Sequence, residues 1–409
     1  MDQAAQKRSL VIIWITIFID LMGITLIIPY INDFVADLGG DERQVGFLLA
    51  SYALMQLLFA PVWGRISDRI GRRPVIIIGL ATSAVAFTIF GLADELWLLF
   101  ASRALAGMAN ANISTAQAYV ADITPPEQRA GRMGIVMAAF NLGFIIGFPI
   151  GGFMATAFGN KAPALFAAGM SALNCLAALV ILPESLPKAK RAARADAQTR
   201  GGMLEAMTAS FRNLAQFWRR PAISRLLTVL LLYTAAFSTL HVVFVEYGRD
   251  ILKISPLERG FVFMFIGIVG AIVQLIFIKP LVRRWGEDRV IELGLASMAI
   301  GLASIPYLPT YTLMFLGSFF ISAGNSLVMP VVSAVISQRS ADDEQGVAMG
   351  VTQSLSALGR IIGPPYGGLS YALLGFRFPF VSAALLALVS LGLFMARAKR
   401  VVATEEMGR

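Results

Sequence analysis

Long apolar runs recur along the whole chain, and this feature limits its fold more than any other. A run of roughly 20 apolar residues is long enough to cross the hydrocarbon core of a bilayer. In lipid the backbone has to satisfy its own hydrogen bonds, so we expect each run to be a helix. Charged residues make up only 14% of the chain, well below the share in soluble domains. The sequence therefore predicts an all-α polytopic membrane protein.

The hydropathy pattern predicts twelve transmembrane spans. They lie at residues 10–31, 44–64, 74–93, 96–121, 131–156, 162–183, 222–246, 259–281, 289–308, 311–336, 346–373 and 377–397. The first run has no small-residue cleavage site and carries Asp20, so we expect it to be a span and not a signal peptide. An even number of spans places both termini on one side.

The basic residues indicate which side that is. Of the 34 Lys and Arg residues, 25 fall on the side of the termini. The opposite side carries Arg43, Lys161, Arg249, Lys253, Arg259 and Arg377. By the positive-inside rule both termini are expected in the cytoplasm. The net charge of +9 is thus a topology signal, and no nucleic-acid partner is expected.

The chain divides into two similar halves. Residues 184–221 form a polar, basic linker with an amphipathic helix expected at its end, between a bundle of six spans at 1–183 and another at 222–409. The segment GFIIGFPIGG at 143–152 is echoed by GRIIGPPYGG at 359–368. RRWGEDRV at 283–290 likewise echoes DRIGRRPV at 68–75. Such a repeat is the layout of secondary transporters that rock two bundles around a central site.

The charged hairpin GRISDRIGRRP at 64–74 resembles the loop signature between the second and third helices of the major facilitator superfamily. AYVADITPPEQRAGRMG, RALAG and GFIIGFPIGG make the chain similar to the drug:proton antiporter branch, and above all to tetracycline efflux proteins. The hairpin residues that carry the resemblance are Gly64, Asp68, Arg69, Gly71 and Arg72. Those of the fifth-helix motif are Gly143, Gly147, Pro149, Gly151 and Gly152, with the proline one residue later than in the family.

The resemblance implies that this hairpin is part of a cytoplasmic gate. Gly64 and Gly71 are expected to let two helices turn back closely. Asp68 suits the positive end of the eleventh helix, and the guanidinium of Arg72 suits the carboxylate of Asp122. The alternative is that the arginines only fix topology.

Ionisable groups inside a membrane are costly and therefore candidates for function. Asp20, in the first span, and Arg103, in the fourth, are expected at similar depth, where a contact between them would keep the carboxylate charged. The antiporter branch gives such a pair the coupling of proton to substrate. The alternative is a purely structural ion pair.

Four further polar residues are candidates for the substrate cavity. Arg360 has no counterpart in the first half, and His241 is the only histidine. Arg360 could instead extend toward the headgroups, and His241 could be an ordinary hydrogen-bonded residue of the interior. Asn112 and Asn141 could line the cavity or join helices.

The predicted function is proton-coupled efflux of small amphipathic compounds by alternating access, as in drug and antibiotic resistance. Tetracycline transporters carry further acids where this chain has Ala86 and Met298, so a porter for a metabolite or organic anion is the alternative. No enzymatic motif is present. We expect a monomer in a bacterial cytoplasmic (inner) membrane, with the proton gradient as energy source, no cofactor or metal, and membrane lipids, protons and a small molecule as partners.

Overall fold

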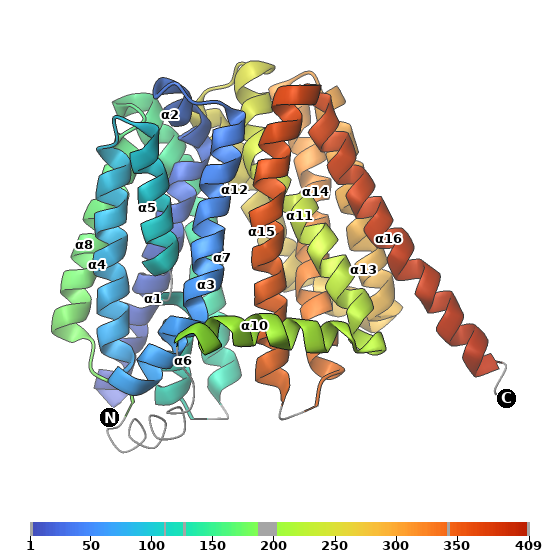
Figure 1. Cartoon of the computed structure of the whole chain (residues 1–409), viewed down its shortest axis with the longest axis horizontal. Coiled ribbons are helices and arrows are strands. Elements are labelled where there is room, and N and C mark those ends of the chain that lie inside the picture. Colours follow the sequence, from blue (N-terminus) through green and yellow to red (C-terminus); the bar gives the residue numbers. More distant parts are fainter. Residues whose placement is uncertain (1–2, 110–111, 126–127, 187–202, 342–343, 407–409) are drawn as a thin grey trace. The chain divides into compact units, whose positions relative to one another are not determined.

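The computed structural model describes residues 3–109, 112–125, 128–186, 203–341 and 344–406, and every regular element within them is helical. Figure 1 shows the arrangement of these helices. The helices before the linker are α1 (Gln3–Ile27), α2 (Ile31–Asp37), α3 (Glu42–Ile70), α4 (Arg72–Gly91), α5 (Leu96–Ala109), α6 (Asn112–Ile123), α7 (Arg129–Phe158) and α8 (Ala162–Ile181). A 3₁₀ turn, η1 (Ile28–Tyr30), joins α1 to α2.

The part after the linker is also helical. Its elements are α10 (Met203–Trp218), α11 (Pro221–Asp250), α12 (Pro256–Ile272), the π-helical turn η3 (Val273–Phe277), α13 (Ile278–Ser304), the 3₁₀ turn η4 (Ile305–Tyr307), α14 (Tyr311–Gln338), α15 (Gln345–Leu374) and α16 (Arg377–Glu406). The amphipathic helix expected after the linker is thus present as α10. The rest of the predicted linker, residues 187–202, lies outside the described residues.

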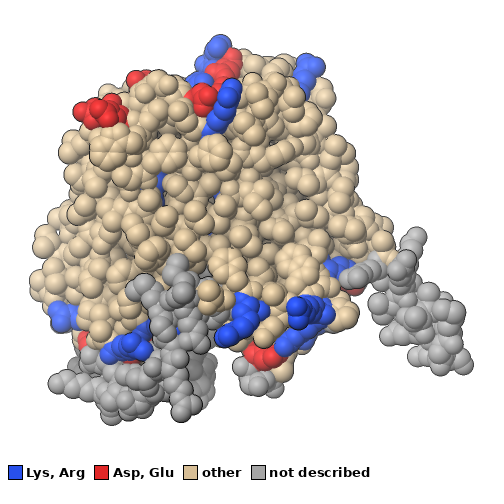
Figure 2. Space-filling model, in the orientation of Figure 1, with Lys and Arg blue, Asp and Glu red and all other residues tan. Residues whose placement is uncertain are grey.

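Within the described residues, helices occupy all twelve ranges predicted as spans, and residues 110 and 111 of the range 96–121 lie outside that part. Among the described residues, nine helical segments are long and apolar enough to cross a membrane. One of these, Pro256–Tyr307, contains two of the predicted spans. They are separated by Gly286, whose positive φ of 80° turns the chain inside α13. Figure 2 shows charged side chains gathered toward the helix ends, with an uncharged band between them. The protein is a multi-pass membrane protein.

The chain forms two compact units that do not follow the order of the sequence strictly. Unit 1 comprises Met1–Asp41, Ser51–Ala209 and Ser255–Met264, and unit 2 comprises Glu42–Ala50, Ser210–Ile254 and Phe265–Arg409. The first turns of α3 therefore belong to unit 2, and the first turns of α12 belong to unit 1. The bundles predicted at 1–183 and 222–409 differ from these units at those two places.

Each unit has its own interior. In unit 1, apolar residues of α1, α4, α6, α7 and α8 share one core that includes Ile13, Ile17, Leu80 and Tyr119. The hydroxyl of Tyr119 donates to the carbonyl of Pro183 at 2.8 Å, so its polar atom is satisfied. In unit 2, α11 lies beside α15 and α16, and α13 lies between α14 and α16.

Candidate functional site

The hairpin at 64–73 turns at a single glycine. Gly71 has φ 111° and ψ 165°, a conformation that side chains disfavour, and a Cβ there would lie 2.7 Å from the carboxyl carbon of Glu184. Gly64 lies inside α3, and a Cβ built on it meets no described atom within 4 Å. The prediction that Gly64 also serves the turn is wrong, because α3 continues as a helix to Ile70 before the chain reverses.

Arg72, the first residue of α4, contacts two acidic residues, Asp68 of the same hairpin and Asp122 of α6. Its side chain is buried, and one guanidinium nitrogen lies 2.8 Å from Asp68 Oδ1 while Nε lies 3.3 Å from Asp122 Oδ2. A third nitrogen donates to the hydroxyl of Ser67. The predicted contact between Arg72 and Asp122 is thus present. Arg69, by contrast, is exposed at the end of α3.

Glu184 completes this cluster, and the sequence analysis missed it. Its carboxylate accepts the backbone N–H of Arg72 at 2.9 Å and that of Arg73 at 3.3 Å. Both N–H groups lie in the first turn of α4, where they have no acceptor within the helix. A negative charge is favoured at this end of a helix. The signal in the sequence is a lone glutamate directly after the sixth span, but nothing local relates it to a helix start more than a hundred residues away.

The glycines of the fifth-helix motif bring α7 close to α1. A Cβ at Gly143 would lie 3.0 Å from Leu21 Cβ, and one at Gly151 would lie 2.6 Å from the carbonyl carbon of Leu26. Gly147 faces the hydroxyl of Thr25, which donates to the carbonyl of Gly143 at 3.0 Å. These three positions therefore require glycine for close helix packing.

The last residues of the motif contact α12. A Cβ at Gly152 would lie 2.8 Å from Leu257 Cα, and a Cβ at Gly260 would lie 3.1 Å from Pro149 Cα. The rings of Phe148 and Phe263 stack with centroids 4.8 Å apart. In unit 1, α7 therefore has one face on α1 and another on the first turns of α12.

The two membrane-buried residues of the predicted coupling pair lie on α1 and α5. Asp20 is 7% exposed and Arg103 is 4% exposed. The guanidinium of Arg103 lies over the rings of Phe90 and Phe87, at 4.5 and 5.4 Å from their centroids, with Ser102 Oγ at 3.4 Å. Asp20 is not among its contacts, so the predicted ion pair is absent from this structure. The reason is that α5 packs against α4, whose aromatic rings take up the cation.

The remaining candidates lie on α11, α15, α6 and α7. His241 Nδ1 lies 3.2 Å from the carbonyl of Ser238, and its ring meets that of Phe237 edge-on. Arg360 lies on α15, whose Gly359 and Gly363 pack against Thr234 and Ser238 of α11, the helix that carries His241. Asn141 is partly buried in α7, whereas Asn112 lies in α6 with its side chain outside the described part.

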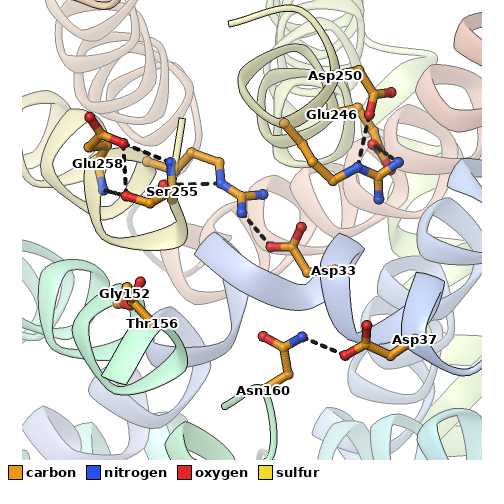
Figure 3. A network of polar contacts seen from close by, with 11 residues as sticks. Asp33, Asp37, Gly152, Thr156, Asn160, Glu246, Asp250, Ser255 and Glu258 are labelled. Atoms are coloured by element: carbon orange, nitrogen blue, oxygen red, sulfur yellow. Dashed lines mark hydrogen bonds and ion pairs between the residues drawn. The ribbon is translucent and has the colours of Figure 1, made fainter. Parts of the chain in front are cut away.

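An ion pair in unit 1 was not predicted. Arg259, in the first turn of α12, is 1% exposed and donates to the carboxylate of Asp33 on α2, as Figure 3 shows. Ser255 and Glu258 form a capping box at the start of α12, with Ser255 N–H 2.7 Å from Glu258 Oε2 and Glu258 N–H 3.3 Å from Ser255 Oγ. The letters SPLE are a recognisable capping signal, but the partner of Arg259 lies 226 positions away.

Three carboxylates of unit 2 lie close together and are the described residues best placed to hold a cation. Oxygen atoms of Glu42, Glu246 and Asp250 lie within 4.8 Å of one another. Arg249 already lies 2.7 Å from Glu246 and 2.9 Å from Asp250. Because this arginine already occupies oxygen atoms of two of the three carboxylates, we assign no metal to the group.

The start of α15 carries a surface ion pair. Arg220 donates two hydrogen bonds, of 2.6 and 2.8 Å, to the carboxylate of Glu344. This bidentate contact holds the pKa of Glu344 below its usual value. The stabilisation is present above the ordinary pKa of a glutamate and is lost as the pH falls through the lowered value.

Comparison with known proteins decides the family. The sequence profile of the Major Facilitator Superfamily matches residues 13–309 and, in an overlapping match, residues 249–407. This chain belongs to the major facilitator superfamily. Members of this superfamily are transporters, so the protein is a transporter of small molecules and not an enzyme.

Curated relatives of this major facilitator are resistance proteins. Multidrug resistance protein 2 of Bacillus subtilis is 30% identical over 393 residues, which cover 95% of each chain. Tetracycline resistance protein, class C, of Escherichia coli is 31% identical over 364 residues, or 88% of each chain. The resemblance to drug and tetracycline efflux proteins predicted from the motifs is confirmed.

The fold of this major facilitator is also found in solved structures. A bacterial homologue of the human lysosomal transporter Spinster, in an inward-facing and unoccupied conformation, matches with a TM-score of 0.81 over 98% of each chain. Its sequence identity of 14% makes this a likeness of fold alone. The predicted all-α fold is thus confirmed.

Proposed function

We propose that this protein is a proton-coupled antiporter that exports small amphipathic compounds by alternating access. The observation that carries the proposal is Asp20, a carboxylate on α1 that is 7% exposed and lies in the middle of the span predicted at 10–31. Such a group is costly at membrane depth and gains most by binding a proton or a cationic substrate. The resistance proteins among the relatives support export of drug-like compounds.

The same proposal covers location and assembly. The excess of Lys and Arg on the side of the termini supports an orientation with both ends in the cytoplasm. The bacterial relatives support a place in the cytoplasmic membrane. We propose that one chain is the working unit, because both copies of the internal repeat lie within it.

Arg103 keeps a role in this proposal without contacting Asp20. Its guanidinium is held by aromatic rings and a weak hydrogen bond to Ser102, and its Nε has no hydrogen-bond partner among the described residues. A buried cation held this loosely can move to a carboxylate when the helices shift. We propose that Arg103 approaches Asp20 in another step of the transport cycle and favours release of its proton.

The test uses purified protein in proteoliposomes, with a panel of cationic, neutral and anionic drug-like compounds. We expect Asp20→Asn to lower the rate of transport against a substrate gradient by at least about tenfold, because the group that binds the proton is lost. Exchange of substrate without a pH gradient should persist. The matched control is Asp94→Asn, in an exposed turn between α4 and α5. Gradient-driven transport that survives in Asp20→Asn would refute the coupling role.

The alternative is a porter for a metabolite or an organic anion. It is favoured by one observation, the position of Arg360 and His241 on the two closely packed helices α15 and α11 of unit 2. In the same assay, Arg360→Gln would then abolish transport of anions alone. Equal effects of this substitution on cationic and anionic compounds would rule the alternative out.

A further inference from the structure

The start of α13 carries a basic hollow. Lys279, Pro280, Arg283 and Arg284 line a shallow space of about 510 Å³, and all four are exposed. Among the described residues, none of the three cations forms an ion pair. Three cations in one hollow favour an anion with several oxygen acceptors.

The repeat within the chain explains why these cations are available. Gly71 and Gly286 occupy equivalent positions in the two hairpins, and both have a positive φ. In register with them, Arg283 replaces Asp68 and Glu287 replaces Arg72, so the charges are exchanged. The first hairpin joins its pair at 2.8 Å. The second does not, because Glu287 instead accepts a hydrogen bond of 3.2 Å from Gln338.

The other neighbouring acid is engaged as well. Asp288 lies 3.9 Å from the guanidinium of Arg225 on α11. The acids of the second hairpin are thus directed toward the helices of unit 2, and the cations of the basic hollow are directed outward. The second hairpin therefore has the same glycine turn as the first hairpin but lacks the ion pair within it.

An exposed apolar surface adjoins the basic hollow. Leu275 and Ile276 in η3 are 78% and 59% exposed, and Phe277 is also exposed. At about 1.5 Å per residue, this surface lies roughly 5–10 Å along the helix from the three cations. That is the spacing from the upper acyl chains to the phosphates of a leaflet. Trp285, which is exposed beside Arg284, is a residue typical of this depth.

We propose that the basic hollow binds the phosphate headgroup of an anionic phospholipid whose acyl chains lie against η3. Basic pockets on the cytoplasmic side of membrane proteins suit such headgroups. The proposal rests on the orientation given under the proposed function, with the hairpins in the cytoplasm. It does not depend on the substrate or on proton coupling.

The test is native mass spectrometry of the full-length protein after exchange into detergent containing phosphatidylglycerol or phosphatidylcholine. The wild type should retain phosphatidylglycerol selectively. A variant without the basic hollow should bind it on the order of a hundredfold more weakly, since each of the three cations near a leaflet contributes about fivefold. That variant combines Lys279→Gln, Arg283→Gln and Arg284→Gln. The matched control removes three other exposed arginines: Arg212→Gln, Arg219→Gln and Arg289→Gln.

A charge-preserving variant guards against loss of the fold. Lys279→Arg combined with Arg283→Lys and Arg284→Lys should retain the lipid. Equal retention by the wild type and the glutamine variant would overturn the proposal, as would equal loss in the control. Displacement of the lipid by millimolar glycerol phosphate would assign the basic hollow to a soluble anion instead. Because the readout is lipid retention, its failure leaves proton-coupled transport untouched, and loss of coupling in Asp20→Asn leaves lipid retention unchanged.

Discussion

At the scale of single residues, Arg72 shows how a buried charge is compensated by its neighbours. Taking a guanidinium out of water costs several kcal/mol, and two carboxylates and a hydroxyl compensate it here. Removal of one of these partners leaves the charge of Arg72 only partly compensated. A buried guanidinium that needs all of these partners has few stable positions. A gate that switches between two states, as predicted for this hairpin, would require such a group.

We expect Arg72→Asp and Asp122→Arg each to reduce transport by about tenfold or more, because each leaves a buried charge without its partner. The double exchange should restore part of the activity. Restoration is incomplete because Asp68, 2.8 Å from the arginine in the wild type, then faces a second carboxylate. Adding Asp68→Asn to the exchange should raise transport further. Initial rates of substrate uptake into everted vesicles, in which an exporter pumps toward the lumen, measure all four variants.

A matched exchange elsewhere controls for this series. Arg220 and Glu344 form a bidentate but half-exposed pair, so Arg220→Glu combined with Glu344→Arg should leave transport close to the wild type. If the exchange of Arg72 and Asp122 restores nothing at all, the ion pair does not act as a gate.

At the scale of helices, the same packing device occurs twice. Gly359, Gly363 and Gly367 of α15 lie against Thr234, Ala235 and Thr239 of α11, as the motif glycines of α7 lie against α1. Thr239 donates to the carbonyl of Gly363 at 3.2 Å, as Thr25 donates to that of Gly143. Helices this close have little room for side chains, so the pairs α1–α7 and α11–α15 are expected to move as rigid bodies.

Gly363→Ala should lower the thermal stability of the purified protein. The added Cβ would lie 2.9 Å from Ser238 Cβ and closer still to the carbonyl of Ala235. Overpacking of this kind costs about 1–3 kcal/mol. The control is Gly169→Ala on α8, where a Cβ meets no described atom within 4 Å and alanine is the better helix former. A melting curve in detergent that shifts equally for both variants would contradict the close-packing interpretation.

The helices were predictable and several of their contacts were not. The length of an apolar run determines a span almost by itself, so the described residues of all twelve ranges are mainly helical. The pairing of Arg72 with Asp122 followed from a motif. By contrast, Arg103 could reach either a carboxylate or the rings of Phe87 and Phe90, and only the packing of α5 on α4 decides between them.

Contacts distant in sequence were out of reach for a related reason. Glu184 and Asp33 are ordinary acids in short connecting segments, and nothing local distinguishes them from solvated charges. Their partners, the start of α4 and Arg259, become neighbours only once the helices are assembled.

At the scale of the whole molecule, the two units exchange short segments. The start of α3 belongs to unit 2, where Gly46 and Gly368 make close contacts with Pro365 and Glu42. The start of α12 belongs to unit 1, where Gly152 and Gly260 make the equivalent contacts. Both exchanged segments are the first turns of a long helix whose remainder lies in the other unit. Under the proposed alternating-access cycle such segments would have to detach, so the contacts that hold each of them inside its unit are targets for a test.

The pair of Asp33 and Arg259 is the strongest polar contact of the exchanged segment of α12. We expect Arg259→Met to favour detachment of this segment, because Asp33 loses its partner while the bulk of the side chain is kept. The probe is Val262→Cys in a Cys175→Ser background, since Val262 is fully buried in unit 1. Labelling by an impermeant maleimide added outside intact cells should become roughly 10- to 100-fold faster. Arg259→Lys should keep labelling slow, and Arg377→Met, at an outer turn of unit 2, should leave it unchanged. Labelling that stays slow in Arg259→Met would mean that apolar contacts such as Phe148 with Phe263 hold the segment without help from the ion pair.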